Sequence, residues 1–502
     1  MRRLLAWFTM MLISADLGFA QGQLIPSASV IDNSVKSYSI PDHGGLSVTT
    51  DGGSPDNIDV GFSRIIPDAG SMTPAGVAIF GFRVNGVLVS EAGVVASSLL
   101  QTGRIYVEVN GPINTGVAIA NPNSQAATVS FSFTQADGTD FGLGSLTIPA
   151  HGQRAAFLNQ PPFNVGSIVQ GTMTFRSNVP ISVITLRGFT NERGEFLITT
   201  LPVLDTSAPA GVGTAVLPHF ADGGGITGSG WTTSVILINP TDSAMSGTVQ
   251  FLDGTGASTE LTVAGTTSDT FSYSLPRRSS FKLVTAGGVG PTIRSGSVWI
   301  SPFPGNGTPT SLALFSYKPE VFTISEAGVP SNAGTAFRMY AETSSSGAAG
   351  SIQTGIAVTN SSGSAASVTF ELFKLDGTSA LLAPVSISVP GAGQNAKFLN
   401  EIFPTLASPF RGVLRTTTNS PGIAVVGLRG RYNERGDFLI TTTPSANEGA
   451  ASTSAELNFP HIVNGGGYTT QFVLFSGTAG QNASGSLHFL KQDGTSFQLD
   501  VE

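Results

Sequence analysis

The chain has 502 residues and a formal net charge of -8, with only 11% charged residues, 62 glycines and no cysteine. A thin acidic charge without any Lys/Arg cluster argues against binding to nucleic acid or to anionic membranes. The lack of cysteine excludes disulfides, cysteine-based zinc sites, cysteine nucleophiles and a lipoprotein anchor. About 480 residues remain beyond the N-terminal segment, enough for three or four domains.

The N-terminus has the pattern of a secretory signal peptide. Arg2 and Arg3 precede an apolar stretch over residues 4–19, which closes with the small residues Gly18 and Ala20. We therefore expect residues 1–20 to be a signal peptide cleaved after Ala20. No second apolar run of membrane-spanning length follows, so we expect no membrane insertion. The expected location is secreted, extracellular or at the cell surface, with the periplasm as a further option.

Short strands separated by turns follow along the chain. Asn85-Gly86 lies between two apolar runs and predicts a two-residue hairpin loop. From residue 146 the apolar runs are too short for helices and too regular for loops. They span 146–148, 154–159, 171–176, 181–189, 195–203, 215–220, 232–239 and 247–253. About eight strands in 120 residues predict an all-β chain of Greek-key, immunoglobulin-like β-sandwiches.

Two repeats overlap in this sequence. Residues 186–200 return almost letter for letter as 428–442, and Ser-Glu-Ala-Gly-Val at 90–94 returns at 325–329. A shorter period divides each long copy, because an Asp-Gly turn between apolar strands recurs at residues 137, 253, 376 and 493. An aliphatic residue followed by proline also recurs four times. The pattern predicts four tandem units in the order A-B-A-B.

The unit boundaries can be placed in two ways. Cutting before each proline marker gives four complete β-sandwich domains, 21–145, 146–262, 263–384 and 385–502, and this is the favoured division. Cutting at the repeated Pro-His segments, Pro218-His219 and Pro460-His461, leaves half a unit at each end. The halves 24–94 and 459–502 would then make one domain, within one chain or between neighbouring chains. The second case would allow head-to-tail self-association through terminal strands.

The duplicated charged string is the first candidate for a ligand site. Charges are scarce in this chain and they gather there, which makes it a candidate binding loop; a solvated hairpin tip is the other interpretation. The candidate residues are Arg187, Glu192 and Arg193, with Arg429, Glu434, Arg435 and Asp437 in the second copy. Arg435-Gly436-Asp437 also spells the tripeptide that integrin-binding adhesins display.

Other residues could serve as ligands for metals or sugars. Asp51, Asp56 and Asp59 form the one dense acidic stretch and could hold Ca²⁺, the only cofactor that we consider. His219 and His461 each precede a glycine triplet but lack the partners of a metal or catalytic set, so we interpret them as structural. Aromatic platforms for sugar binding would come from Trp231, Tyr468, Tyr340 and Tyr432.

Three segments give the chain a family resemblance: Ser-Glu-Ala-Gly-Val, residues 432–442, and the Pro-His segment followed by residues 465–470. They resemble those of a group of exported repeat proteins from soil bacteria. The resemblance extends over nearly the whole chain after the signal peptide and implies export and tandem sandwiches. That group has no assigned activity, so it implies no functional residues.

These observations lead to three hypotheses about function. The first is a secreted, non-enzymatic repeat protein with a structural, surface or adhesion role, whose partner is a surface polymer, a glycan or a protein. The alternative is an extracellular array of carbohydrate-binding modules. The third is a secreted hydrolase, for which no catalytic constellation or Gly-x-Ser-x-Gly elbow is visible.

Overall fold

Strands make up nearly all of the regular structure, which confirms the all-β prediction. The computed structural model describes residues 32–225, 229–288, 290–344 and 347–502. Residues 33–502 form one compact unit, while the expected signal peptide, residues 1–20, lies outside the described residues. No helix in the described ranges is both long enough and apolar enough to span a bilayer. The unit contains four curled sheets, each folded into a sandwich, and we number these sandwiches first to fourth.

The third sandwich (residues 215–330) shows the common plan. One layer has the order β19-β16-β21-β14 and the other has β20-β15-β22-β23, and the two layers join at the tip of the β14–β15 hairpin. The strands are β14 (Ala215–Gly225), β15 (Gly230–Ile238), β16 (Met245–Asp253), β19 (Thr270–Leu275), β20 (Ser280–Val284), β21 (Gly290–Pro302), β22 (Thr310–Lys318) and β23 (Ser325–Pro330). A small ribbon of β17 (Leu261–Val263) and β18 (Thr266–Ser268) is added.

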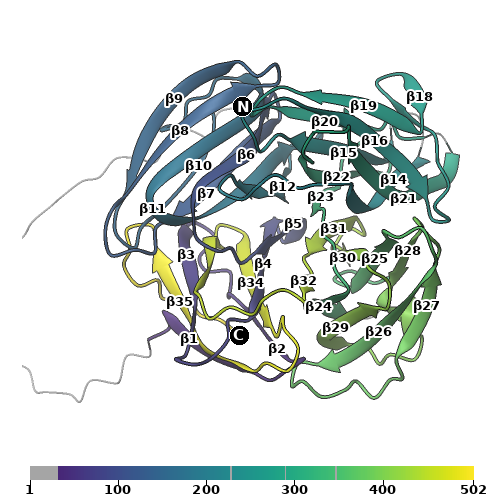
Figure 1. Ribbon diagram of the computed structural model, residues 1–502. Coiled ribbons are helices and arrows are strands. Elements are labelled where there is room, and N and C mark those ends of the chain that lie inside the picture. Colours follow the sequence, from purple (N-terminus) through teal and green to yellow (C-terminus); the bar gives the residue numbers. More distant parts are fainter. Residues whose placement is uncertain (1–31, 226–228, 289, 345–346) are drawn as a thin grey trace, which may run out of the picture. The chain divides into compact units, whose positions relative to one another are not determined.

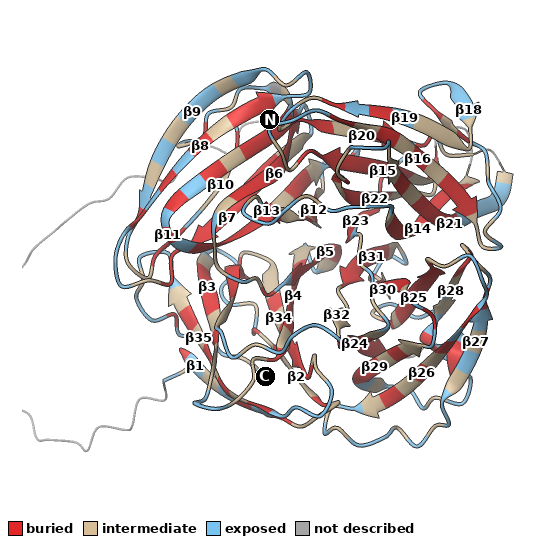
Figure 2. Cartoon of the chain, in the orientation of Figure 1, coloured by how far each residue is buried: buried red, intermediate tan, exposed pale blue. Residues whose placement is uncertain are grey.

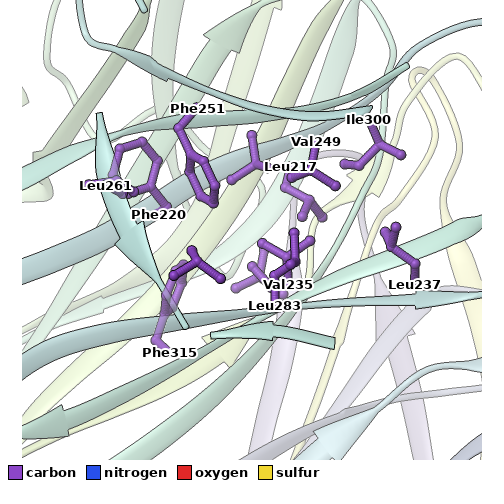
Figure 3. Close-up of a cluster of buried hydrophobic side chains, with 14 of the residues drawn as sticks. Leu217, Phe220, Val235, Leu237, Val249, Phe251, Leu261, Leu283, Ile300 and Phe315 are labelled. Carbon is purple, nitrogen blue, oxygen red and sulfur yellow. The ribbon is translucent and has the colours of Figure 1, made fainter. Parts of the chain in front are cut away.

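Alternating side chains build the core of this sandwich. Along β16, buried residues such as Val249 and Phe251 alternate with half-buried ones, as expected for a strand with one face on a core. Figure 3 shows Val249, Phe251 and Phe220 from one layer facing side chains such as Val235 from the other. Apolar burial between two layers is the main source of stability in such a fold.

The second sandwich (100–205) repeats the strand arrangement of the third, except that one long strand takes the places of β21 and β22. The first half of β11 pairs with β6 and β8, and its second half pairs with β7 and β12. The strands are β6 (Leu100–Asn110), β7 (Ile113–Ala120), β8 (Ala127–Gln135), β9 (Asp140–Ile148), β10 (Gln153–Phe157), β11 (Ile168–Thr190), β12 (Phe196–Leu201) and β13 (Val203–Asp205).

The fourth sandwich (336–447) has the same order and includes a single helical turn, α1 (Leu399–Ile402). Its strands are β24 (Ala336–Thr343), β25 (Ile352–Asn360), β26 (Ala366–Lys374), β27 (Val385–Val389), β28 (Gln394–Phe398), β29 (Phe410–Thr418), β30 (Ile423–Tyr432), β31 (Phe438–Thr443) and β32 (Ala446–Asn447).

The first sandwich is made from both ends of residues 33–502. Its strands are β1 (Val35–Ile40), β2 (Gly45–Thr49), β3 (Ile58–Pro67), β4 (Ala75–Val84), β5 (Val87–Val95), β33 (Leu457–Gly465), β34 (Tyr468–Phe475) and β35 (Ala483–Lys491). β35 lies between β1 and β3, and β34 lies between β2 and β4. Figure 1 shows the purple N-terminal strands beside the yellow C-terminal ones.

This pairing corrects the favoured domain boundaries. The ranges 21–145 and 385–502 are not separate domains, because each layer of the first sandwich contains strands from both ends of the chain. The other division, cut at the Pro-His segments and closed within one chain, is the one observed. Its physical reason is that either half alone would leave open edges in both layers, with unpaired backbone groups.

One strand from each sandwich lies at the centre of the unit. β5, β12, β23 and β31 contact one another in cyclic order, so every sandwich contributes one strand. Figure 2 shows these strands mostly in the buried colour, whereas peripheral strands such as β9 are largely exposed. Each sandwich therefore has two neighbours, and contacts between sandwiches provide the sites described below.

Candidate functional site: interfaces between sandwiches

The central strands are connected by hydrogen bonds that replace ordinary ladder pairing. The hydroxyl of Thr200 donates to the Gly93 carbonyl (2.8 Å), and the Gly93 N–H donates to the hydroxyl of Thr441 (2.9 Å). In the other half, Thr442 donates to the Gly328 carbonyl (2.7 Å) and the Gly328 N–H donates to Thr199 (3.0 Å). The repeated Ser-Glu-Ala-Gly-Val and Leu-Ile-Thr-Thr segments are thus contact segments between sandwiches.

Glycine is required at the centre of this contact. A Cβ added to Gly93 would lie 2.0 Å from the Thr442 carbonyl oxygen, and one added to Gly328 would lie 2.3 Å from that of Thr200. Both distances are well inside van der Waals contact. The glycine of each Ser-Glu-Ala-Gly-Val segment is therefore explained by close approach of two backbones.

Buried ion clusters hold the second sandwich to the third. Arg187 donates to Glu108 of its own sandwich (3.0 Å) and to Glu326 of the third (3.0 Å). Lys282 adds a second bond to Glu108 at 2.9 Å. All but the lysine are nearly inaccessible, with side-chain exposures of 6% to 9%. The arginine predicted as a surface ligand is therefore a buried structural cation.

The fourth and first sandwiches are joined by the equivalent cluster. Arg429 donates to Glu342 and, at 3.4 Å, to Glu91. Arg411 and Arg431 complete it, with bonds of 2.9 Å to Glu342 and Glu91 respectively. We call these two contacts, second to third and fourth to first, the charged interfaces.

Neighbouring charges shift the pKa values of Arg429 and Glu342 in the second of these clusters. Burial alone would lower the pKa of Arg429, but the carboxylates of Glu91 and Glu342 outweigh it and raise that pKa. Burial would raise the pKa of Glu342, and the neighbouring guanidinium groups lower it instead. Arg429 and Glu342 are therefore ionised at neutral pH, which makes either one costly to remove alone.

The duplicated Asn-Glu-Arg-Gly loops bind to each other and to neighbouring sandwiches. Arg193 of one copy bonds to Asp437 of the other at 3.0 Å, and Arg435 bonds to Glu195 at 2.6 Å. The two copies therefore face one another as a reciprocal pair. Arg435 also bonds to Asp437 at 3.0 Å, so the arginine and aspartate of the Arg-Gly-Asp tripeptide are both engaged within the chain.

The remaining loop residues attach to the next sandwich. Glu434 accepts the Leu88 N–H (2.8 Å) and bonds to Arg83 (2.6 Å). Burial opposes ionisation, but these bonds lower the pKa of Glu434 to about 2. In the other copy, Glu192 accepts the Thr323 N–H (2.8 Å) and bonds to a lysine.

The other two contacts between sandwiches contain cavities of similar lining, in addition to one of about 360 Å³ beside the central strands. Between the third and fourth sandwiches lies a cavity of about 440 Å³ with His219 and Trp231 on one side and Phe398 and Phe438 on the other. Between the first and second lies a cavity of about 220 Å³ with His461 and Tyr468 in the corresponding positions. We call these two contacts the histidine interfaces. Trp231 and Tyr468, predicted as candidate ligand residues, thus occupy matching places.

Each histidine is held by a glutamine from the neighbouring sandwich. Gln394 Nε2 lies 2.8 Å from Nδ1 of His219, and Gln153 Nε2 lies 3.2 Å from Nδ1 of His461. Gln153 Nε2 also donates to the Pro460 carbonyl (3.1 Å), which identifies it as the amide nitrogen. Burial lowers the pKa of both imidazoles to about 4, so they are neutral at pH 7.

An aromatic groove adjoins the larger cavity. Trp231 stacks on Tyr317, with ring centroids 4.4 Å apart and planes inclined by 24°. Tyr432, Gln353 and Asp437 share this groove of about 520 Å³. Tyr340, the remaining aromatic candidate, is instead buried between the fourth and first sandwiches, where its hydroxyl donates to Glu342 (3.3 Å).

The predicted calcium residues lie on the first sandwich, before and within β3. Asp51 accepts the Gly53 N–H (2.9 Å), and Asp59 accepts the Asn57 amide (3.0 Å). Asp56 lies between them in the same loop and is exposed. Within the described ranges, no three His, Asp or Glu side chains are grouped as metal ligands. Calcium binding by these residues stays a prediction.

Sequence reasoning missed the cavities and the pairing between motifs. Ala396, Leu428 and Phe438 line the larger cavity, yet each lies in an ordinary strand pattern. One signal was available: Arg187 and Glu326 belong to the two most strongly repeated strings, and both strings carry a rare buried charge of opposite sign. Two repeated strings with complementary charges indicate a contact.

Comparisons with known proteins give no relative. No protein-family model and no curated protein matches the chain. Among solved structures, the Anabaena sensory rhodopsin transducer is 23% identical, with 17% of this chain and 95% of that one covered and a TM-score of 0.16. Thermotoga maritima 1070 is 13% identical over 20% and 93%, with a TM-score of 0.18. A GH2 beta-galacturonidase from Eisenbergiella tayi is 11% identical over 69% and 44%, at 0.15.

Proposed function

We propose that this chain is an exported, non-enzymatic protein with a structural, surface or adhesion role. The observation that carries the proposal is where the repeated motifs lie. The chain uses its scarce charges and its repeated strings to bind sandwich to sandwich, as Arg187 and Arg429 illustrate. Sandwiches joined in this way would keep their outer surfaces at constant positions relative to one another. This suits a surface or matrix component that contacts a polymer, a glycan or another protein.

Alternation of two sandwich types is part of this proposal. The first and third sandwiches carry the Pro-His segments, and the second and fourth carry the Asn-Glu-Arg-Gly loops, which supports an A-B-A-B array. The sandwiches resemble immunoglobulin domains in that each would consist of two packed Greek-key layers. In an immunoglobulin constant domain the first strand pairs with the second, whereas here β14 pairs with the sixth strand, β21.

Activity and pull-down measurements on the full chain test the proposal. Purified protein should release no product from panels of polysaccharide, ester and peptide substrates. It should sediment with bacterial envelope preparations or insoluble polysaccharide in a saturable way. Turnover of any substrate in the panel would contradict the non-enzymatic part, and failure to sediment with every surface would contradict the surface role.

Glycan binding is a second candidate function, favoured by the aromatic groove. Stacked Trp231 and Tyr317, with Tyr432 opposite and Gln353 and Asp437 as polar partners, offer both an apolar face and hydrogen-bonding groups for a sugar. This groove lies between the third and fourth sandwiches, so the glycan candidate concerns the one site there.

A glycan array with two variants tests this candidate. Trp231→Ala and Tyr432→Ala should each weaken binding about tenfold or more, because a stacking aromatic is lost. Phe303→Ala, which removes an exposed aromatic ring that does not line the groove, is the control. Binding that survives both groove substitutions would contradict the assignment.

A further inference from the structure

The cavities at the two histidine interfaces share a set of matching lining residues. In each, one wall comes from an odd sandwich and the other from an even sandwich. Matching pairs are His219 and His461, Phe315 and Phe80, Ile293 and Ile58, Phe398 and Phe157, Leu428 and Leu186, Phe438 and Phe196, and Ile440 and Ile198. In both, a phenylalanine ring stands edge-on to the histidine, at centroid distances of 5.5 and 5.7 Å.

Each cavity has one imidazole in a mostly apolar wall, and the larger one is also lined by Ser295, Lys397 and Glu401. Because the glutamine amide donates to Nδ1, the neutral imidazole carries its proton on Nε2. Among the described residues, Nε2 of neither His219 nor His461 has a hydrogen-bond partner. Both histidines line their cavities and are half-buried, so each offers an N–H donor beside aromatic and aliphatic side chains.

Packing alone does not account for the repeated space. Protein interiors are close-packed and leave few voids larger than a water molecule. A cavity of about 360 Å³ also lies beside the central strands, against Leu201 of the second sandwich and Leu312 of the third, but no described histidine lines it. At the histidine interfaces, by contrast, an imidazole and the same set of aromatic and aliphatic side chains line a cavity twice.

We propose that both histidine interfaces are binding sites for a small aromatic molecule that carries one hydrogen-bond acceptor, such as an aryl ketone or ester. The ring would lie against the phenylalanine and aliphatic walls, and its oxygen would accept the Nε2 hydrogen of His219 or His461. Size supports this class, since an apolar cavity of about 150 Å³ suffices for benzene, and the smaller cavity here has about 220 Å³. Two sites per chain separate this proposal from the single glycan site and make it independent of the proposed function.

Two matched probes test the proposal on the full chain. Acetophenone has the ring and the carbonyl acceptor, and ethylbenzene has the same shape without the acceptor. We expect acetophenone to bind at two sites per chain, detected by ligand-observed NMR and calorimetry. Ethylbenzene should bind about fivefold more weakly because one neutral hydrogen bond is missing. Absence of acetophenone binding, or equal affinities for the two probes, would overturn the proposal.

Substitutions then locate the sites. Ala396 is exposed at the rim of the larger cavity, so Ala396→Phe should fill that cavity and reduce the stoichiometry from two sites to one. Ala136→Phe, on an exposed turn of the second sandwich, is the matched control and should keep both sites. The double variant His219→Leu and His461→Leu should bring the affinity ratio of the two probes close to one. Two sites retained in Ala396→Phe would overturn the assignment even if the histidine variant failed to fold.

Discussion

Neighbouring sandwiches in this chain are joined in two different ways, and the two ways alternate. At the charged interfaces, Arg187 and Arg429 are enclosed by carboxylates from both sides. At the histidine interfaces, a neutral ring receives one hydrogen bond from a glutamine and lies beside a cavity. The charged interfaces determine which surfaces pack together, because burying a charge without its partner costs free energy of folding. The second kind of interface leaves a cavity beside a histidine, where the proposed aromatic ligand would bind.

The largest effect should come from breaking a charged interface. Arg187→Met keeps most of the side-chain volume but leaves Glu326 without a cation partner among the described residues. Removing one partner of a buried pair typically costs about 3–5 kcal/mol. We expect the free energy of unfolding, measured in urea, to fall by about that amount.

The equivalent change in the other cluster sharpens this test. Arg429→Met leaves Arg411 and Arg431 beside the same carboxylates, so its cost should be smaller than that of Arg187→Met. Arg176→Met, at an exposed position with no ion pair among the described contacts, is the control and should change little. Equal stability of all three variants would contradict the role given to the buried clusters.

The histidine interfaces should show their effect through pH. Unfolded histidine titrates near 6.5, whereas burial lowers the pKa of His219 and His461 to about 4 in the folded chain. Between these values the unfolded state binds more protons, so stability is complete above about pH 6.5 and falls as the pH drops toward 4. We expect a loss on the order of 3 kcal/mol for both residues together, allowing for their partial access to the cavities.

Urea unfolding between pH 7 and 5 measures this slope before the carboxylates titrate. The double variant His219→Gln and His461→Gln should lose most of the slope. Burial also lowers the pKa of His43, with Arg338 adding to the effect, so a residual slope should remain. An unchanged slope in the double variant would show that the two imidazoles are not neutral in the folded chain.

The central strands contact both kinds of interface, so one added methyl group there should destabilise both. Gly93→Ala places a carbon 2.0 Å from the Thr442 carbonyl oxygen, and Gly328→Ala makes the equivalent clash with Thr200. Overpacking of this kind costs about 1–3 kcal/mol, so we expect about 2 kcal/mol for each in thermal or urea unfolding. Gly363→Ala, which meets nothing within 4 Å, is the control.

Much of this fold could be predicted from the sequence, because local patterns determine strands. Alternation such as that of β16, and turns such as Asn85-Gly86, depend on neighbours within a few residues. The repeat period predicted four units, and the described residues form four large sheets. The phase of the units could not be fixed, because a repeat can be cut anywhere and the pairing of β1 with β35 joins residues more than 440 apart.

The roles of the candidate site residues were harder to predict, because those roles depend on which surfaces pack against each other. Arg187, interpreted from sequence as a loop ligand, lies in β11 and is buried against the third sandwich. Arg193 and Arg435 were recognised as charged loop residues, but their partners belong to the other copy of the motif. A sequence shows that two strings are similar, whereas only packing shows that they face each other.

The smallest expected effect tests whether the two histidine interfaces are still equivalent. Gln394→Leu removes one side-chain hydrogen bond, to His219, and should cost about 1 kcal/mol. Gln153→Leu removes bonds to His461, to the Pro460 carbonyl and to Gln492, and leaves that carbonyl without its side-chain donor. It should cost about 2 kcal/mol in the same urea measurement. Equal losses would mean that the glutamine serves only the histidine at both interfaces. Unequal losses in the expected order would show that Gln153 also stabilises the chain through the Pro460 carbonyl and Gln492, two contacts that the Gln394 side chain does not make among the described residues.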